Sequence, residues 1–133
     1  MTPDIVETFL YDHFAPWVLA LKPKVAQADT QKTVLEIPVT DALNRTGGIV
    51  CGQALSALAD TAMVLACGAH EGQMIPVGTV TLDTQFMRPA SGDSIRAEAE
   101  ITRAGKSMIF ARCTLYAEPS GKAVATATAT FAR

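Results

Sequence analysis

The sequence contains few cysteines, few aromatic residues and little excess charge. Its three cysteines, Cys51, Cys67 and Cys113, are an odd number without the spacing of metal ligands, so we expect neither a disulfide framework nor a metal site. The net charge of −2 provides no basic field that would attract nucleic acid or an anionic membrane. The first residues lack the basic segment of a secretory signal. We therefore expect a reduced, cytoplasmic protein with no nucleic-acid or membrane partner.

The chain is short and rich in small apolar side chains. With 133 residues, of which 49% are hydrophobic, it has the size and composition of one globular domain over residues 1–133. The segment from Thr46 to Ala69 is long enough to cross a membrane, but Asp60 near its centre would cost about 2.5–3.5 kcal/mol on insertion. We interpret this segment as a buried helix of a globular protein.

Apolar periodicity predicts the order of the elements. An N-terminal helix is expected over residues 1–21, with Pro3 in its first turn and a bend at Pro16. A long second helix covers about residues 50–69, where both faces are nearly apolar. Alternation with period two predicts about five strands, at residues 32–40, 77–88, 94–104, 108–117 and 123–132.

One long helix laid on a curved antiparallel sheet is an α+β arrangement, and this order of elements is that of the hotdog fold. The alternating alanines and threonines from Ala125 to Thr130 give one strand a small-residue face that can receive the helix. A sheet of about five strands leaves an edge with unpaired backbone groups, which a second copy of the sheet can cover. We therefore expect a homo-oligomer, either a dimer or a dimer of dimers.

Asp60 is the only Asp, Glu, Lys or Arg between Arg45 and Glu71. Burying an ionised carboxylate without a partner costs several kcal/mol, so an isolated carboxylate in an apolar helix requires an explanation. Either an arginine or hydroxyl groups elsewhere in the chain pair with it, or the carboxylate takes part in chemistry. The residues alone leave both interpretations open.

Three stretches of the sequence carry a resemblance to a known family. The loop and helix start from Asn44 to Ala62 read NRTGGIVCGQALSALADTA, the strand from Thr79 to Ala90 reads TVTLDTQFMRPA, and the turn from Arg103 to Ser107 reads RAGKS. They resemble the hotdog-fold acyl-CoA thioesterases of the phenylacetic-acid-degradation type, in the branch similar to 4-hydroxybenzoyl-CoA thioesterase. The resemblance implies an acyl-CoA substrate, no cofactor beyond the coenzyme A of that substrate, and a site that a neighbouring subunit completes.

The resemblance also assigns roles to residues at the start of the long helix. Asp60 falls on the acidic position of the family, which implies that it acts as general base or nucleophile. Where the family usually has His-Gly-Gly, this chain has Cys51, Gly52 and Gln53, so the histidine that helps to orient the thioester is missing. Cys51 can be read as a small buried residue or as a nucleophile, although neither His13 nor His70 is placed by the sequence to assist it.

Thioester hydrolysis needs a base or nucleophile, and it needs donors for the oxyanion that forms on the carbonyl oxygen. The backbone N–H groups around Gly52 and Gln53, at the start of a helix, can supply these donors. The Gln53 side chain can also donate to the carbonyl, or it is simply a polar residue of the first turn. Asp60 lies about 12 Å further along the same helix, a distance that a site shared between subunits would resolve.

Two further residues have both a functional and a structural interpretation. In the family, an Asn at the position of Asn44 lies near the thioester, whereas locally Asn44 can hold the loop by side-chain to backbone bonds. At the position of Thr79 the family has a Thr or Ser that can hold the catalytic water, whereas threonine is also an ordinary strand residue.

Basic residues near two turns are candidates for binding the phosphates and pantetheine of coenzyme A. Arg88, Arg103, Lys106 and Ser107 can bind anionic groups, and Gly105 exposes the backbone between them. Each one alone is better explained as a solvated surface residue, and the turn gains weight mainly from the family resemblance. An apolar pocket for the acyl group can be built from large side chains that core packing also explains, namely Phe14, Trp17, Met63, Phe86 and Met87.

The sequence thus predicts a homo-oligomeric acyl-CoA thioesterase. A non-catalytic hotdog protein that binds an acyl thioester is the alternative, because Cys51 replaces the family histidine. A hydratase acting on an acyl thioester is less favoured, because it needs a histidine paired with the acid, and neither His13 nor His70 occupies such a position.

Overall fold

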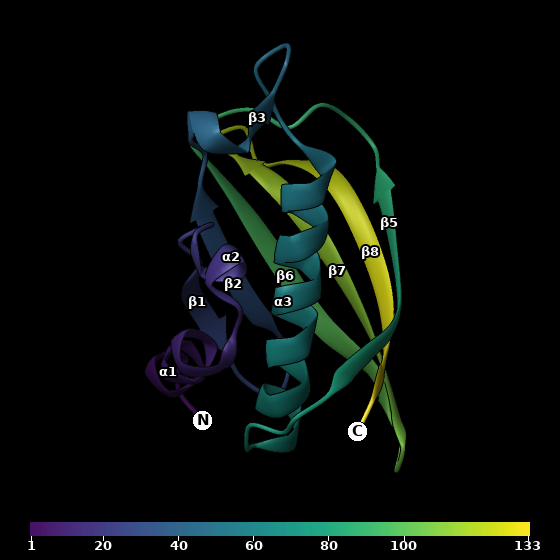
Figure 1. Cartoon of the computed structure of the whole chain (residues 1–133). Helices are drawn as coiled ribbons and strands as arrows, with labels where there is room; N and C mark the ends of the chain where they lie inside the picture. Colours follow the sequence, from purple (N-terminus) through teal and green to yellow (C-terminus); the bar gives the residue numbers. More distant parts are fainter.

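A six-stranded antiparallel sheet curves around the long helix α3, Gly52–Glu71 (Figure 1). The computed structural model describes all 133 residues. Across the sheet the strand order is β1-β2-β6-β7-β8-β5. The strands are β1 (Lys24–Ala28), β2 (Thr33–Pro38), β5 (Gly78–Phe86), β6 (Ser94–Ala104), β7 (Met108–Glu118) and β8 (Lys122–Ala132). This arrangement confirms the predicted α+β hotdog fold.

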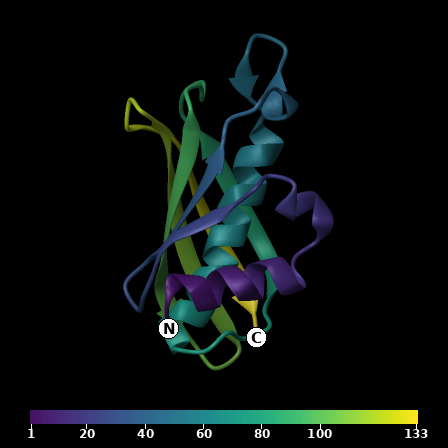
Figure 2. The same cartoon turned by 90° about the vertical axis from the view of Figure 1, so that its left-hand side faces the viewer.

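The remaining elements are short and lie around α3. They are α1 (Pro3–His13), α2 (Pro16–Leu19), a 3-10 turn (Asp41–Leu43) and a hairpin of β3 (Asn44–Arg45) and β4 (Ile49–Val50). Figure 2 shows α1 and α2 on the same side of the sheet as α3, while the β3–β4 hairpin projects beyond the start of α3. None of the helices combines the length and the apolar character needed to cross a membrane.

Small residues on both contact surfaces let α3 lie close against the sheet. The inner face of the sheet carries buried alanines, and the facing side of α3 does the same with Ala54, Ala59, Ala62 and Ala66. On the sheet these alanines are Ala97, Ala99, Ala111, Ala125, Ala127 and Ala129. The alternation predicted for the last strand is confirmed, since Ala125, Ala127 and Ala129 face the core.

The end of α3 is set by Gly72, which adopts a left-handed conformation with φ of 80°. Its N–H donates to the carbonyl of Ala69, and the N–H of Gln73 reaches back to the carbonyl of Gly68. Glycine carries no Cβ penalty in this conformation, so it closes the helix with a capping turn.

The structure differs from the sequence-based expectation at the N-terminal side. The sheet has one strand more than the five predicted, because the short strand β1 pairs with β2 through a register shift between Val25 and Gln27 that hides its alternation. The expected helix over residues 1–21 is interrupted after α1. Proline disfavours helical conformation in the residue before it, and Ala15 before Pro16 is extended, with ψ of 142°.

Strand β5 forms one edge of the sheet and pairs on one side only, with β8. Almost all of its residues are exposed, among them several large apolar side chains. These are Val80, Leu82 and Phe86, followed directly by Met87. The elements that position the candidate site are therefore α3 and this edge strand.

Candidate active site

One stripe of α3 faces the inner surface of the edge strand β5. Gly52, Ser56 and Asp60 follow one another at intervals of four residues, which places them on one face of the helix. Ser56 Oγ donates a hydrogen bond of 3.2 Å to Thr84 Oγ1, and Thr79 Oγ1 donates one of 2.9 Å to Asp60 Oδ1. The structure therefore brings together Asp60 and Thr79, two of the residues predicted for the site.

A bulge in β5 turns Thr79 toward the helix. Residues directly opposite in an antiparallel pair share a face, so Leu82 opposite Ala129 and Thr84 opposite Ala127 both face inward. Strict alternation would then place Val80 inward and Thr79 outward. The register shifts between Thr79 and Thr81, and Thr79 consequently lies opposite the buried Phe131.

Asp60 has no cationic partner in the chain. No Lys, Arg or His lies within ion-pair distance of its carboxylate, so the interpretation that an arginine pairs with it is not supported within one subunit. Burial raises the pKa of Asp60 above its ordinary value, while the hydrogen bond from Thr79 opposes part of this rise. A raised pKa makes the carboxylate a better proton acceptor when it is ionised.

The start of α3 is left without a side-chain cap. Cys51 occupies the N-cap position and makes no side-chain capping bond, so the first amides of the helix, at Gly52 and Gln53, have no acceptor within the helix. Gly52 also lies against an aromatic ring, since a Cβ built on it would be 3.1 Å from Cζ of Phe86. Unsatisfied amides at a helix N-terminus are suited to binding an oxyanion.

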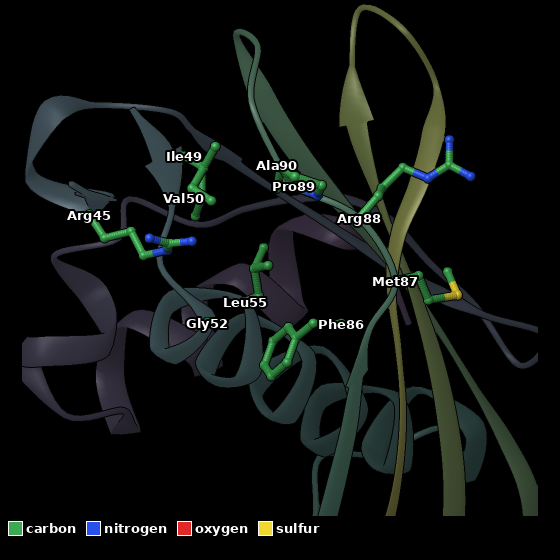
Figure 3. Close-up of a pocket in the computed structure, with 10 residues that line it drawn as sticks. All are labelled: Arg45, Ile49, Val50, Gly52, Leu55, Phe86, Met87, Arg88, Pro89 and Ala90. Atoms are coloured by element: carbon green, nitrogen blue, oxygen red, sulfur yellow. The ribbon is translucent and has the colours of Figure 1, made fainter. Parts of the chain in front are cut away.

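A cavity of about 460 Å³ opens beside Gly52. Figure 3 shows that its walls come from the β3–β4 hairpin, the first turns of α3 and the segment after β5. Of its two arginines, Arg45 is directed into the space near Gly52 and Leu55, whereas the side chain of Arg88 points away from it. The cavity is lined by Arg45, Ile49, Val50, Gly52, Leu55, Phe86, Met87, Arg88, Pro89 and Ala90.

Asn44 and Gln53 flank this cavity without lining it. Asn44 lies opposite Val50 in the β3–β4 hairpin, and its Oδ1 is buried with no hydrogen-bond partner. Gln53 is exposed, and its side chain makes no hydrogen bond within the chain. Within one subunit, neither side chain makes a hydrogen bond that would hold it in a catalytic position.

The residues predicted to bind coenzyme A are divided between the two ends of α3. Arg88 lies near the start of the helix, whereas Gly105 and Lys106 line an open groove of about 580 Å³ at its end, together with His70 and Arg133. A helix of 20 residues is about 30 Å long, so one subunit does not unite the two groups. Arg103 belongs to the second group, because its Nη1 would lie 3.0 Å from a Cβ on Gly105, and Ser107 accepts a bond of 3.0 Å from the Arg133 amide.

The structure adds residues that the sequence did not single out. Arg133 Nη1 donates to Glu71 Oε1 at 2.6 Å and to the carbonyl of Gly105 at 3.1 Å, so it ties the turn to the end of α3. No sequence signal indicated this contact, because its members are 28 and 62 residues apart. For the Ser56–Thr84 contact, the sequence indicated only that Ser56 shares a helix face with Asp60, four residues further on.

Only some of the residues expected to form the acyl pocket lie at the cavity, and two of the three cysteines are buried. Phe86 and Met87 line the cavity, whereas Met63 is fully buried in the core and Phe14 and Trp17 lie elsewhere. Burial raises the pKa of both Cys67 and Cys113 to about 12, so these thiols stay protonated at neutral pH.

Comparison with known proteins shows the family of the chain. The family model of the thioesterase superfamily matches residues 47–124, which include the start of α3, Asp60, Thr79 and the Arg103–Ser107 turn. The chain belongs to the thioesterase superfamily.

Individual relatives agree with this assignment. A Thermoplasma volcanium protein that bears an esterase name is 31% identical over 80 residues, a match that covers 60% of this chain and 59% of that protein's length. A thioesterase family protein from Silicibacter pomeroyi is 26% identical with a TM-score of 0.84, covering 96% of this chain and 93% of that one. The PaaI protein of the Escherichia coli phenylacetic acid degradation operon shares the fold with a TM-score of 0.84 at 21% identity, covering 98% and 92% of the two chains.

Proposed function

We propose that the protein is an acyl-CoA thioesterase that hydrolyses a thioester to a free carboxylic acid and coenzyme A. The observation that carries the proposal is Asp60, a half-buried carboxylate with a raised pKa, no cationic partner and a hydroxyl group in hydrogen-bond contact. Membership of the thioesterase superfamily supports the same reaction.

The groups at the site suit the two requirements of thioester hydrolysis. Asp60, as general base, takes a proton from a water molecule whose oxygen attacks the carbonyl carbon, or it attacks that carbon itself as nucleophile. The uncapped amides at the start of α3 stabilise the negative charge that forms on the carbonyl oxygen. When the carbon–sulfur bond breaks, the thiol of coenzyme A leaves with a proton. Thr79 holds the carboxylate, or the water beside it, in position.

Asp60 and Gly52 are about 12 Å apart along α3, so one subunit cannot apply both to the same carbonyl. We infer that two copies join through their β5 edges, whose backbone groups and apolar side chains are open. An antiparallel pairing of two β5 strands also makes the two α3 helices antiparallel. The start of one helix then approaches the middle and end of the other, which unites Gly52 with Asp60 of the partner subunit.

The same pairing explains the division of the coenzyme A residues. It moves the Gly105–Lys106 turn of one subunit toward the Gly52 and Arg88 end of the other, where the two groups can hold one coenzyme A molecule. In this arrangement the phosphates meet Lys106, Arg103 and Arg88, and the pantetheine arm runs along the turn at Gly105 and Ser107. Asn44, with its unpartnered Oδ1, and Gln53 adjoin the thioester end of the site.

The first experiment is to measure thiol release from short-chain, medium-chain and aryl acyl-CoA thioesters with the wild-type protein and with Asp60→Asn. Loss of a positioned base reduces turnover by about a hundredfold or more, and asparagine keeps the shape of the side chain. Circular dichroism and size-exclusion chromatography show that the variant keeps its fold and assembly. Binding of acyl-CoA without turnover in either protein would contradict the proposal and indicate a non-catalytic thioester-binding protein, with Cys51, in place of the family histidine, as the first residue to examine.

A further inference from the structure

The geometry points to Arg45 as the residue that selects acyl groups ending in a carboxylate, so that coenzyme A monothioesters of short dicarboxylic acids are the preferred substrates. This inference rests on the proposed thioesterase function and adds to it the chemical class of the acyl group.

The cavity beside Gly52 suits an acyl chain better than a pantetheine arm. Most of its wall is hydrocarbon, from Ile49, Val50, Leu55, Phe86, Pro89 and Ala90. The amide-rich pantetheine arm would lose hydrogen bonds to water there, whereas an alkyl chain gains by leaving water. A thioester carbonyl that contacts the amide of Gly52 can therefore direct its acyl chain into the cavity.

Arg45 is the one charged side chain directed into this apolar space, since Arg88 points away from it (Figure 3). Its side chain donates one hydrogen bond, of 3.1 Å from Nη1 to the carbonyl of Thr46, and no carboxylate of the chain lies within ion-pair distance. The remaining N–H groups of the guanidinium are available to a ligand. A guanidinium binds a carboxylate through two parallel hydrogen bonds, which makes this group the best-matched ligand.

The β3–β4 hairpin keeps Arg45 close to the start of α3, and this limits the length of acyl chain that can lie between them. Arg45 is paired with Ile49 across β3 and β4, and Gly52 follows Ile49 by only three positions. Three steps along the chain span at most roughly 10 Å, so the hairpin holds Arg45 near the start of α3, and a short acyl chain of about six carbons is the length to test. A longer chain would have to fold within the cavity or pass beyond the guanidinium.

The phosphates of coenzyme A are the other anionic groups that an arginine can bind. In the proposed dimer the phosphates have other cations, namely Arg88, whose side chain points away from the apolar space, and Lys106 of the partner subunit, which lies on an open polar groove. The acyl carboxylate is therefore the favoured partner of Arg45, and the two sources are separable by experiment.

The test compares kcat/KM for adipyl and hexanoyl thioesters, each as the coenzyme A ester and as the N-acetylcysteamine ester, which lacks phosphate. We expect the wild-type protein to prefer adipyl over hexanoyl by about tenfold or more in both series, the range of a charge-assisted hydrogen-bond pair. Arg45→Met should abolish this ratio mainly through KM. Arg112→Met is the matched control, because Arg112 pairs with Glu100 on the outer face of the sheet, and it should keep the ratio.

Three results would overturn the inference. Equal rates for adipyl and hexanoyl esters in the wild-type protein would show that no carboxylate is selected. If Arg45→Met lowers kcat/KM equally for the adipyl and hexanoyl coenzyme A esters and leaves the N-acetylcysteamine esters unchanged, Arg45 binds the phosphates. If no thioester is hydrolysed, the proposed function fails separately, and calorimetry with adipate and hexanoate decides the inference: adipate binding that Arg45→Met does not weaken would contradict it.

Discussion

Thr79 Oγ1 lies 2.9 Å from Asp60 Oδ1 because a bulge in β5 turns Thr79 onto the inner face of the strand. Bulges commonly aim a side chain at an active site, and here the bulge places a hydrogen-bond donor beside Asp60. Of the two carboxylates in α3, Glu71 pairs with Arg133, whereas Asp60 has no cationic partner. The contact favours the ionised form of Asp60 and thereby opposes the effect of burial on its pKa.

Removing this hydroxyl should shift the pH dependence of the enzyme. In Thr79→Val the hydrogen bond is lost, so the pKa of Asp60 should rise further and the acidic limb of the kcat/KM profile should move to higher pH. Thr79→Ser keeps a hydroxyl at the same position and should leave the limb where it is. Identical acidic limbs in the wild type and Thr79→Val would show that Asp60 is not the group whose ionisation controls the rate.

The same carboxylate should reduce the stability of the fold at neutral pH. The pKa of Asp60 is higher in the folded protein than the ordinary value of 3.8, so between these two values the folded state binds more protons than the unfolded state. The free energy of unfolding therefore falls as pH rises through this interval. Asp60→Asn lacks the titration and should be more stable than the wild type at pH 7, with the difference vanishing as the pH falls toward 3.8.

Urea unfolding of both proteins at several pH values measures this difference. Asp83→Asn provides the control, because Asp83 is an exposed residue of β5, opposite the exposed Thr128. A wild-type protein that remains as stable as Asp60→Asn at neutral pH would indicate that the carboxylate is fully compensated in the assembled protein.

The fold could be predicted from the sequence because its main elements have strong local patterns. The apolar helix of α3 and the alternation in β6 and β8 are set by side chains that face the core directly. The contact between Asp60 and Thr79 was open to prediction only through family resemblance, because the bulge at Val80 reverses the face that alternation gives to Thr79. Strand β1 was missed since its register shift interrupts the alternation. The separation of Arg88 from Lys106 depends on the tertiary fold and has no local signal.

Gly52 and Phe86 should behave as a coupled pair. A Cβ on Gly52 would approach the Phe86 ring to 3.1 Å, closer than an ordinary contact, and the ring can yield because Phe86 is 55% exposed. We expect Gly52→Ala to leave stability within about 1 kcal/mol of the wild type, since alanine favours the helix, but to lower kcat/KM by displacing the ring within the cavity. Adding Phe86→Ala should recover part of this loss. The four values of kcat/KM form a double-mutant cycle with an expected coupling of about 0.5–3 kcal/mol, and additive effects would contradict direct contact in the active form.

Leu82 should control the assembly of the protein. It is the central residue of β5 and it is 38% exposed. In an antiparallel pairing of two β5 edges that is centred on the strand, the two copies of Leu82 lie next to each other. Leu82→Lys would place two like charges at this point and so weaken the proposed interface. Phe110→Lys is a matched control, because Phe110 is also 38% exposed but lies in β7, between two paired strands.

Analytical ultracentrifugation should show dissociation at micromolar concentration for Leu82→Lys alone. If the active site is shared, thiol release per chain must fall with the fraction of dimer, so a fully active Leu82→Lys monomer would contradict both the interface and the shared site.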